Sequence, residues 1–249
     1  MASTTTTTHK TNVTNLDKFL IELTAYGAYY NPSKASIRLD ALTILFNNVK
    51  AANTVETDAY LLYNNAKNAR ADSYAVSTDI ITRVANAVRS SDISDKVAEN
   101  VLVTIRKFLG RSTTVKQETS VTTTEGTKTV VTKSYNSSKQ DIDSKLTYLE
   151  TIIKQLATIP SYTPNEANLK VDYITTIYND MREKRTIEET AKTAHNNAII
   201  ATDKLMYSDD TGIIDLFTNA KTYVKSLYGA SSPQYKALTH LKFKKYVRR

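Results

Sequence analysis

The 249-residue sequence has no cysteine and no tryptophan, and only three histidines, five glycines and four prolines. Without cysteine there is no disulfide framework, no thiolate zinc site, no iron–sulfur cluster and no cysteine nucleophile. Five isolated glycines exclude a glycine-rich phosphate loop and supply too few turns for an all-β fold. Because glycine and proline interrupt helices, their scarcity predicts an all-α fold with long helices.

Long apolar runs are also missing. No window approaches the roughly 18 apolar residues of a membrane-spanning helix, and the N-terminal region lacks the basic start and apolar core of a secretory signal. The sequence therefore predicts no membrane span and a cytoplasmic location. Residues 1–14, with five consecutive threonines at 4–8, are expected to be a disordered tail. Such polar sequence buries too little apolar surface to offset the entropy of ordering it.

The sequence repeats itself at a shift of about 132 residues. Tyr30-Asn31-Pro32 recurs as Tyr162-Thr163-Pro164, and the residues that follow keep their identity or their apolar character. The identical pairs include Ala35 and Ala167, Asp40 and Asp172, Thr43 and Thr175, and Asn47 and Asn179. This repeat predicts two tandem copies of one antiparallel helical bundle, at residues 15–110 and 145–241.

Each predicted copy reads as the same series of helices. A first helix, about 16–29 in copy one, ends before Asn31-Pro32, since proline disfavours a helical residue before it. The stretches 33–72 and 165–207 follow, with apolar residues at three- and four-residue spacing and an alanine-rich second half. No glycine or proline interrupts them, but Thr54 and Thr186 are possible caps, so one helix or two remain open. Shorter helices are expected at 78–89, 94–109, 213–228 and from 233 onward.

The copies are joined by a threonine- and serine-rich segment at residues 111–144. Between Thr113 and Ser134, β-branched residues alternate with polar ones around Glu125-Gly126, which favours strands. Two alternatives follow: a β-hairpin arm that turns at Glu125-Gly126, or a disordered linker. An isolated two-stranded hairpin is marginal in water. An ordered hairpin would therefore pack on something, and edge pairing with another chain's hairpin is one solution.

Catalytic signatures are not found. No nucleophile elbow, dinucleotide fingerprint, calcium loop or paired-histidine zinc helix is present, so we assign no catalytic, cofactor-binding or metal-binding residue and no cofactor. His9 lies in the predicted tail. His195 takes the position of Tyr63 in copy one, which favours packing of a polar-tipped ring over catalysis. Asp209 and Asp210 are better explained by the start of a helix than by a cation site.

Four asparagines recur in the middle of the long helices, where asparagine is a poor helix former. They are Asn64, Asn65, Asn196 and Asn197. They lie beside the alanine-rich face, and an asparagine at a helix contact sets register at some loss of stability. We interpret them as helix-register residues rather than as a ligand site.

The positive charge is concentrated at the C-terminus. Five of the eight net positive charges belong to residues 242–249, which contain no acidic residue, and the rest of the chain is nearly neutral. The basic residues of this segment are Lys242, Lys244, Lys245, Arg248 and Arg249. Such a tail is suited to contact nucleic acid or an acidic protein surface, although it also increases solubility. Phe243 repeats Phe108 and is therefore expected in the core.

Several segments of the second copy resemble one group of proteins. These segments are Tyr162-Thr-Pro164-Asn-Glu-Ala167, Asn197-Ala198, the run Lys221-Thr-Tyr-Val224-Lys225-Ser, and Gly229-Ala-Ser-Ser-Pro233-Gln-Tyr235-Lys236. They look like those of a family of duplicated all-helical Bacteroidota proteins without an assigned function. The resemblance covers most of the chain, and its last run is the most specific. It implies a duplicated helical fold and no activity, ligand or catalytic residue.

Taken as chemistry, the sequence favours a non-enzymatic structural or interaction protein that associates with itself. The duplication, the alanine-rich face and the threonine-rich segment favour this hypothesis. The alternative is a basic nucleic-acid-associated protein that acts through its C-terminal tail. An enzyme is least favoured and would require a deep pocket lined by His195 and carboxylates.

Overall fold

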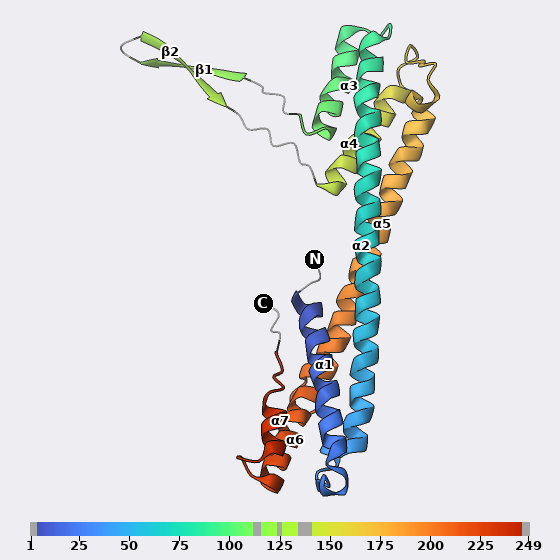
Figure 1. The fold of residues 1–249 in the computed structure, drawn as a ribbon. Coiled ribbons are helices and arrows are strands. Elements are labelled where there is room, and N and C mark those ends of the chain that lie inside the picture. Colours follow the sequence, from blue (N-terminus) through green and yellow to red (C-terminus); the bar gives the residue numbers. More distant parts are fainter. Residues whose placement is uncertain (1–3, 112–115, 124–125, 134–140, 246–249) are drawn as a thin grey trace. The chain divides into compact units, whose positions relative to one another are not determined.

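The computed structural model describes residues 4–111, 116–123, 126–133 and 141–245. The described residues form seven α-helices, three short 3-10 helices and one pair of strands, so the all-α prediction is confirmed for the body of the protein (Figure 1). The elements are α1 (Thr4–Ala25), α2 (Leu39–Ser90), α3 (Asp95–Phe108), β1 (Lys116–Thr123), β2 (Gly126–Lys133), α4 (Ile142–Ala157), α5 (Val171–Tyr207), α6 (Ile213–Tyr228) and α7 (Pro233–Thr239).

Helix α2 is a single helix of 52 residues, and it includes the separate helix expected at 78–89. The matching stretch of the second copy is broken between α5 and α6, as expected. At this break Asp210 has a φ of 61°, and the Gly212 N–H donates to the Ser208 carbonyl at 2.7 Å. A Cβ on Gly212 would lie 2.6 Å from that oxygen. The predicted first copy has no glycine at the matching position, and α2 continues through it.

The chain forms two compact units. Unit 1 is Met1–Asn65 with Glu189–Arg249, and unit 2 is Ala66–Glu188. The predicted boundaries at 15–110 and 145–241 do not coincide with these units, because each unit combines one half of each predicted copy. The reason is the continuity of α2 and α5. Residues at the two ends of an uninterrupted helix cannot enter one core, so each end packs with helices of the other copy.

Unit 1 has its own apolar core. It gathers residues of α1, the first half of α2, the end of α5, and α6 and α7. On α2 these are Leu42, Phe46 and Val49, at the four- and three-residue spacing of one helix face. The ring of Phe19 from α1 meets that of Phe217 from α6 edge-on, with centroids 4.6 Å apart.

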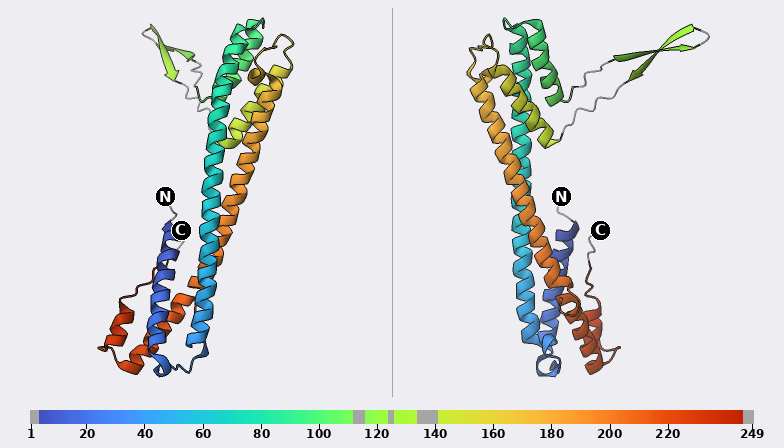
Figure 2. Two further views of the ribbon diagram at one scale, coloured as in Figure 1. Left: turned by 45° about the vertical axis from the view of Figure 1, so that its right-hand side comes forward. Right: turned by 180° about the vertical axis from the view of Figure 1, so that it is seen from behind.

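Unit 2 has a second core from the other half of each long helix. Its buried residues come from the end of α2, from α3 and α4, and from the start of α5. Helices α3 and α4 are side by side in this unit (Figure 2). Phe108 of α3 and Leu149 of α4 are both fully buried. The strong apolar stripe of each short helix is thus covered by its neighbour.

One loop is built in the same way in both units. The Tyr30 hydroxyl donates to the Ile37 carbonyl at 2.6 Å, and the Tyr162 hydroxyl donates to the Leu169 carbonyl at 2.8 Å. Both bonds are buried, and both carbonyls close a 3-10 helix, Ala35–Ile37 or Ala167–Leu169. Burial raises the pKa of Tyr162 to about 12, so the hydroxyl remains a donor at neutral pH. The repeated tyrosine therefore closes the loop before each long helix.

The joining segment contains the strands β1 and β2, which pair antiparallel. Lys116 is opposite Lys133 at one end, and Thr123 is opposite Gly126 at the other. Of the expected turn residues, Gly126 begins β2 and Glu125 lies outside the described residues. The sheet that the described residues form has two strands only. Each strand therefore has one neighbour in the sheet and one outer edge.

The expected disordered tail at 1–14 is wrong for the described residues 4–14, which are the first half of α1. His9 and Asn12 have no exposed surface at all. The composition argument fails here because it counts apolar area alone. These polar side chains are buried against polar partners from distant parts of unit 1, and those contacts offset the entropy of ordering.

Candidate functional site

The described residues offer little for catalysis. They contain no group of three or more histidine, aspartate or glutamate side chains arranged to hold a metal ion. His195 is 6% exposed, and its ring lies 5.3 Å from that of Tyr60 and 6.1 Å from that of Tyr63, measured between centroids. It is thus packed between aromatic rings. Within the described part of the chain, no helix has both the length and the apolar character to cross a membrane.

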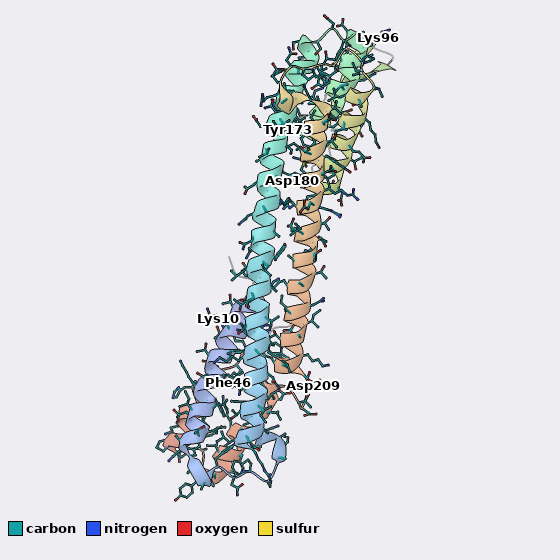
Figure 3. All side chains as sticks on the ribbon, turned by 90° about the vertical axis from the view of Figure 1, so that its right-hand side faces the viewer. Lys10, Phe46, Lys96, Tyr173, Asp180 and Asp209 are labelled. Carbon is teal, nitrogen blue, oxygen red and sulfur yellow. The ribbon has the colours of Figure 1, made fainter. Side chains whose placement is uncertain are left out.

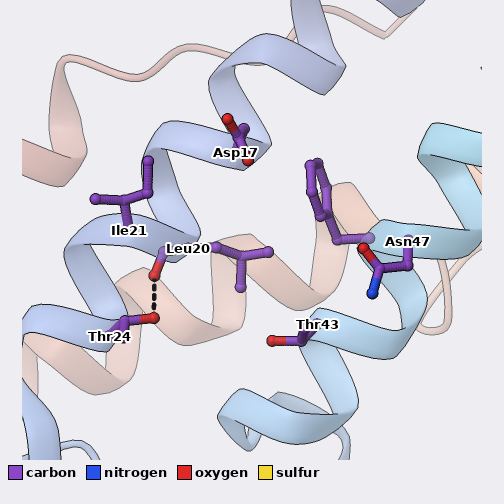
Figure 4. A pocket seen from close by; sticks show the side chains of 7 residues that line it. Asp17, Leu20, Ile21, Thr24, Thr43 and Asn47 are labelled. Atoms are coloured by element: carbon purple, nitrogen blue, oxygen red, sulfur yellow. Dashed lines mark hydrogen bonds between the residues drawn. The ribbon is translucent and has the colours of Figure 1, made fainter.

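A groove of about 330 Å³ lies between α1 and α2 in unit 1 (Figure 4). Its lining is Asp17, Leu20, Ile21, Thr24, Thr43, Phe46 and Asn47. Asp17 is the single ionisable residue of this lining. The Thr24 hydroxyl donates a hydrogen bond to the Leu20 carbonyl at 2.8 Å. A lone carboxylate beside amide and hydroxyl groups does not make an acid–base pair. This groove is also not the pocket that an enzyme built on His195 would need.

A cluster of ionisable side chains lies around His9, where three helices of unit 1 meet. Nδ1 of His9 is 2.7 Å from Oε2 of Glu56 on α2, and Nε2 is 2.8 Å from Oδ1 of Asp203 on α5. The side chains of His9 and Glu56 are completely buried, and that of Asp203 is 24% exposed. The cluster places the His9 ring between two carboxyl groups from two other helices.

Glu56 is held in its charged form. Burial alone would raise the pKa of this carboxyl, but the interaction with His9, together with the side chains of Thr6 and Thr202, outweighs burial and lowers the pKa below its ordinary value. Glu56 is therefore ionised at neutral pH. Because the carboxylate and the ring are enclosed, a substrate has no access to them. The cluster fixes α1 against α2 and α5, and we assign it no catalytic role.

The C-terminal segment Leu241–Lys245 is held on unit 1 by hydrogen bonds to its main chain. Nδ2 of Asn12 donates to the Lys244 carbonyl at 2.8 Å, and the Lys244 N–H donates to Oδ1 of Asn12 at 3.0 Å. Nδ2 of Asn15 donates to the Lys242 carbonyl at 2.8 Å. Nζ of Lys221 donates to the Leu241 carbonyl at 2.6 Å. These side chains come from α1 and α6.

Phe243 supplies the apolar contact of this segment. Its ring centroid lies 6.3 Å from that of Phe19 and 6.2 Å from that of Phe217. Nζ of Lys221 lies 4.9 Å from the Phe243 centroid, which is within the range of a cation–π contact. Phe243 packs against the core of unit 1, as its match with Phe108 predicted.

The basic residues of the predicted tail are only partly described. The side chains of Lys242, Lys244 and Lys245 are exposed, and Nζ of Lys245 lies 3.7 Å from Oδ1 of Asp209. Arg248 and Arg249 lie outside the described residues. The described part of the predicted basic tail, 242–245, is held by amide side chains that bind its main chain.

The asparagines predicted to set helix register are mostly on the surface. Asn65, Asn196 and Asn197 are exposed, and Asn64 is half-buried. The long helices of unit 1 instead meet through His195 and its tyrosines. In unit 2 the Ser73 hydroxyl donates to Oδ2 of Asp180 at 2.5 Å, and Arg70 pairs with Glu188. Asp180 is labelled on α5 in Figure 3. Sequence spacing gave no signal for these pairs, because their partners are more than 100 residues apart.

Comparison with protein-family models, with curated proteins and with solved structures finds no match to this chain. The resemblance to duplicated Bacteroidota proteins therefore stays a prediction. Conclusions about function depend on the residues and geometry described above.

Proposed function

We propose that the protein is a non-enzymatic structural protein that associates with itself. In this proposal, the hairpin β1–β2 of one chain pairs with the hairpin of a second chain. The observation that carries this proposal is the two-stranded sheet, each of whose strands has an outer edge without a strand partner among the described residues. Unpaired edge N–H and carbonyl groups are a template for another strand. Two strands alone are marginally stable in water, so addition of a further strand stabilises both partners.

A second copy of the chain is the partner that fits best. An antiparallel pair of identical edge strands is related by a two-fold axis, which gives a closed, self-complementary interface. Both strands have eight residues, so either edge is of ordinary length for such pairing. The strands follow α3 and precede α4 in the chain. Pairing of these strands between two chains therefore requires no change in either helical core.

The repeat supports the same proposal. The tyrosine-closed loops and the long helices after them recur at the shift seen in the sequence. We attribute this to a tandem duplication of a helical bundle. Duplicated helical scaffolds without an enclosed polar pocket are suited to presenting surfaces. The enclosed His9 cluster and the open groove with its single carboxylate support a role other than catalysis.

Excision of the hairpin tests the proposal. Because Lys116 and Lys133 are opposite each other, residues 117–132 can be replaced by a short Gly-Ser turn that connects these two residues. Light scattering over a concentration series should show a rising mass for the natural chain and a lower, constant mass for the variant. Circular dichroism should show that both keep their helices. A natural chain that stays monomeric, or a variant that associates equally, would contradict the proposal.

Binding of nucleic acid through the C-terminal segment is the second candidate function, favoured by the exposed side chains of its described lysines. The triple variant with alanine at Lys242, Lys244 and Lys245 should then lose affinity for duplex DNA in about 0.1 M salt. A control with alanine at Lys18, Lys34 and Lys50, which are also exposed, removes the same charge elsewhere. Equal affinities of the two variants would exclude a specific role of the segment.

A further inference from the structure

The segment Leu241–Lys245 is bound in the manner of a peptide ligand. Asn12 both donates to and accepts from the main chain of one residue, Lys244. Nδ2 of Asn15 donates a hydrogen bond to the carbonyl of Lys242, two residues earlier in the segment. Main-chain hydrogen bonds of this kind hold an irregular or extended peptide, while pockets for alternate side chains give specificity.

Leu241 and Phe243 of the segment pack against the core of unit 1. The ring of Phe243 lies against those of Phe19 and Phe217, and its neighbours Lys242 and Lys244 remain exposed. The site therefore recognises the main chain of the segment and an aromatic side chain that is flanked by two polar residues. Both the site and its ligand are encoded in the same chain, so every copy carries one of each.

The segment also covers a cationic group of the site. Nζ of Lys221 donates to the main-chain carbonyl of Leu241 and not to a carboxylate. Burial of this ammonium lowers the pKa of Lys221 below its ordinary value, which indicates that the covered charge is partly desolvated. Release of the segment returns water to Lys221. This gain offsets part of the contacts that are lost, and it favours a segment that detaches and rebinds.

We propose that the site formed by Asn12, Asn15, Phe19, Phe217 and Lys221 binds the C-terminal segment of a second copy, so that two chains exchange residues 241–245. An exchanged segment makes the same contacts as one bound within its own chain, and this makes exchange a low-cost route to association. The balance between the two states depends on protein concentration against the effective concentration of the tethered segment. The exchange does not depend on the hairpin.

Peptide binding tests the recognition step. The probe is a fluorescent peptide of residues 240–245, added to the full chain carrying Phe243→Ala, whose own segment is weakened. We expect this peptide to bind at least about tenfold more tightly than a peptide with alanine at 243. We also expect it to bind the Phe243→Ala chain more tightly than the natural chain, where the tethered segment competes. Equal binding of both peptides would overturn the proposal.

A second variant tests the main-chain contacts. Lys244→Pro removes the N–H that donates to Asn12 and fixes φ at this position, while the side chain that it replaces is exposed. In the chain it should free the site for the natural peptide, and in the peptide it should weaken binding. If the peptide carrying proline binds as well as the natural one, the main-chain contacts do not select the segment and the proposal fails.

Exchange between chains is read by energy transfer. Because the natural chain has no cysteine, Thr11→Cys and Lys245→Cys each provide one labelling position, on α1 beside the site and on the segment. A mixture of the two labelled chains should show transfer that disappears when the Lys245→Cys chain also carries Phe243→Ala. Transfer that persists in that variant comes from another joint, such as the hairpin, and overturns exchange. Absence of transfer at concentrations where light scattering shows association does the same, while leaving the hairpin proposal standing.

Discussion

His9 and Glu56 are 47 residues apart in the chain, yet Nδ1 and Oε2 lie 2.7 Å apart and neither side chain has any exposed surface. Asp203 approaches the other ring nitrogen from a third helix. The first helix is thus attached to unit 1 by an ionic cluster near its start as well as by apolar residues further along. This arrangement makes the cluster a sensitive position for mutation.

His9→Ala should destabilise the protein. The substitution removes the ring that lies between the two carboxyl groups and leaves Glu56 buried without this partner. We expect a loss of about 3 kcal/mol in the free energy of unfolding, the usual effect of breaking a buried ion pair. Urea unfolding followed by circular dichroism measures it. His240→Ala is the matched control, because His240 is exposed, and it should change stability by less than about 0.5 kcal/mol. Equal effects would contradict the role of the cluster.

Glu56 should make stability depend on pH in the acid range. Its pKa is lower in the folded state than in the unfolded chain, where a glutamate has a pKa of about 4.3. Its contribution is therefore fully present above that value and is lost as the pH falls through the folded pKa. The natural chain should lose stability below about pH 4 more steeply than Glu56→Gln, which does not titrate. Parallel curves of unfolding free energy against pH would rule this out.

Both tyrosine-closed loops should respond alike to loss of a hydroxyl. Tyr30→Phe and Tyr162→Phe each leave a buried carbonyl, of Ile37 or Leu169, without its donor. We expect each to lower the free energy of unfolding by about 1–3 kcal/mol. Tyr29→Phe serves as the control, since Tyr29 is 76% exposed. Thermal unfolding of the three variants would show whether the hydrogen bonds matter equally in the two units.

Gly212→Ala should strain the turn between α5 and α6. The new Cβ would lie 2.6 Å from the Ser208 carbonyl and 2.7 Å from that of Met206, so the main chain must move. We expect a destabilisation of about 1–3 kcal/mol. Thr211→Ala, at the exposed neighbouring position, should have little effect in the same thermal unfolding measurement. A stable Gly212→Ala protein would show that the turn relaxes readily.

Local patterns in the sequence predicted the helices well. Leu42 and Val49 belong to the apolar stripe predicted for the first long helix, and both are buried in unit 1. The same patterns do not predict which predicted copy a face packs against, because helical periodicity identifies the apolar face but not the helix that covers it. The units therefore combine halves of both copies, contrary to the prediction. The continuity of α2 explains why the units combine both halves. The sequence indicated this continuity, because it has no glycine in α2 at the position that matches Gly212.

Polar contacts over long sequence separations were the hardest to predict. The reading of His9 as part of a disordered tail depended on the composition of its neighbours, whereas its partners are Glu56 and Asp203. Asn12 likewise gains its role from Lys244, 232 residues away. No spacing rule connects such residues. The repeated match of Phe243 with Phe108 was informative by contrast, because it compared two positions in related surroundings.

The residue ranges of the two units determine the order in which they can fold during synthesis. Unit 2 is one continuous stretch, Ala66–Glu188, and all of its residues are made before Asp203. Unit 1 needs both ends of the chain: His9 and Asn12 wait for partners on α5 and at Lys244. Since domains fold as units during synthesis, we expect the middle of this protein to fold first, while its N-terminal helix awaits residues translated last.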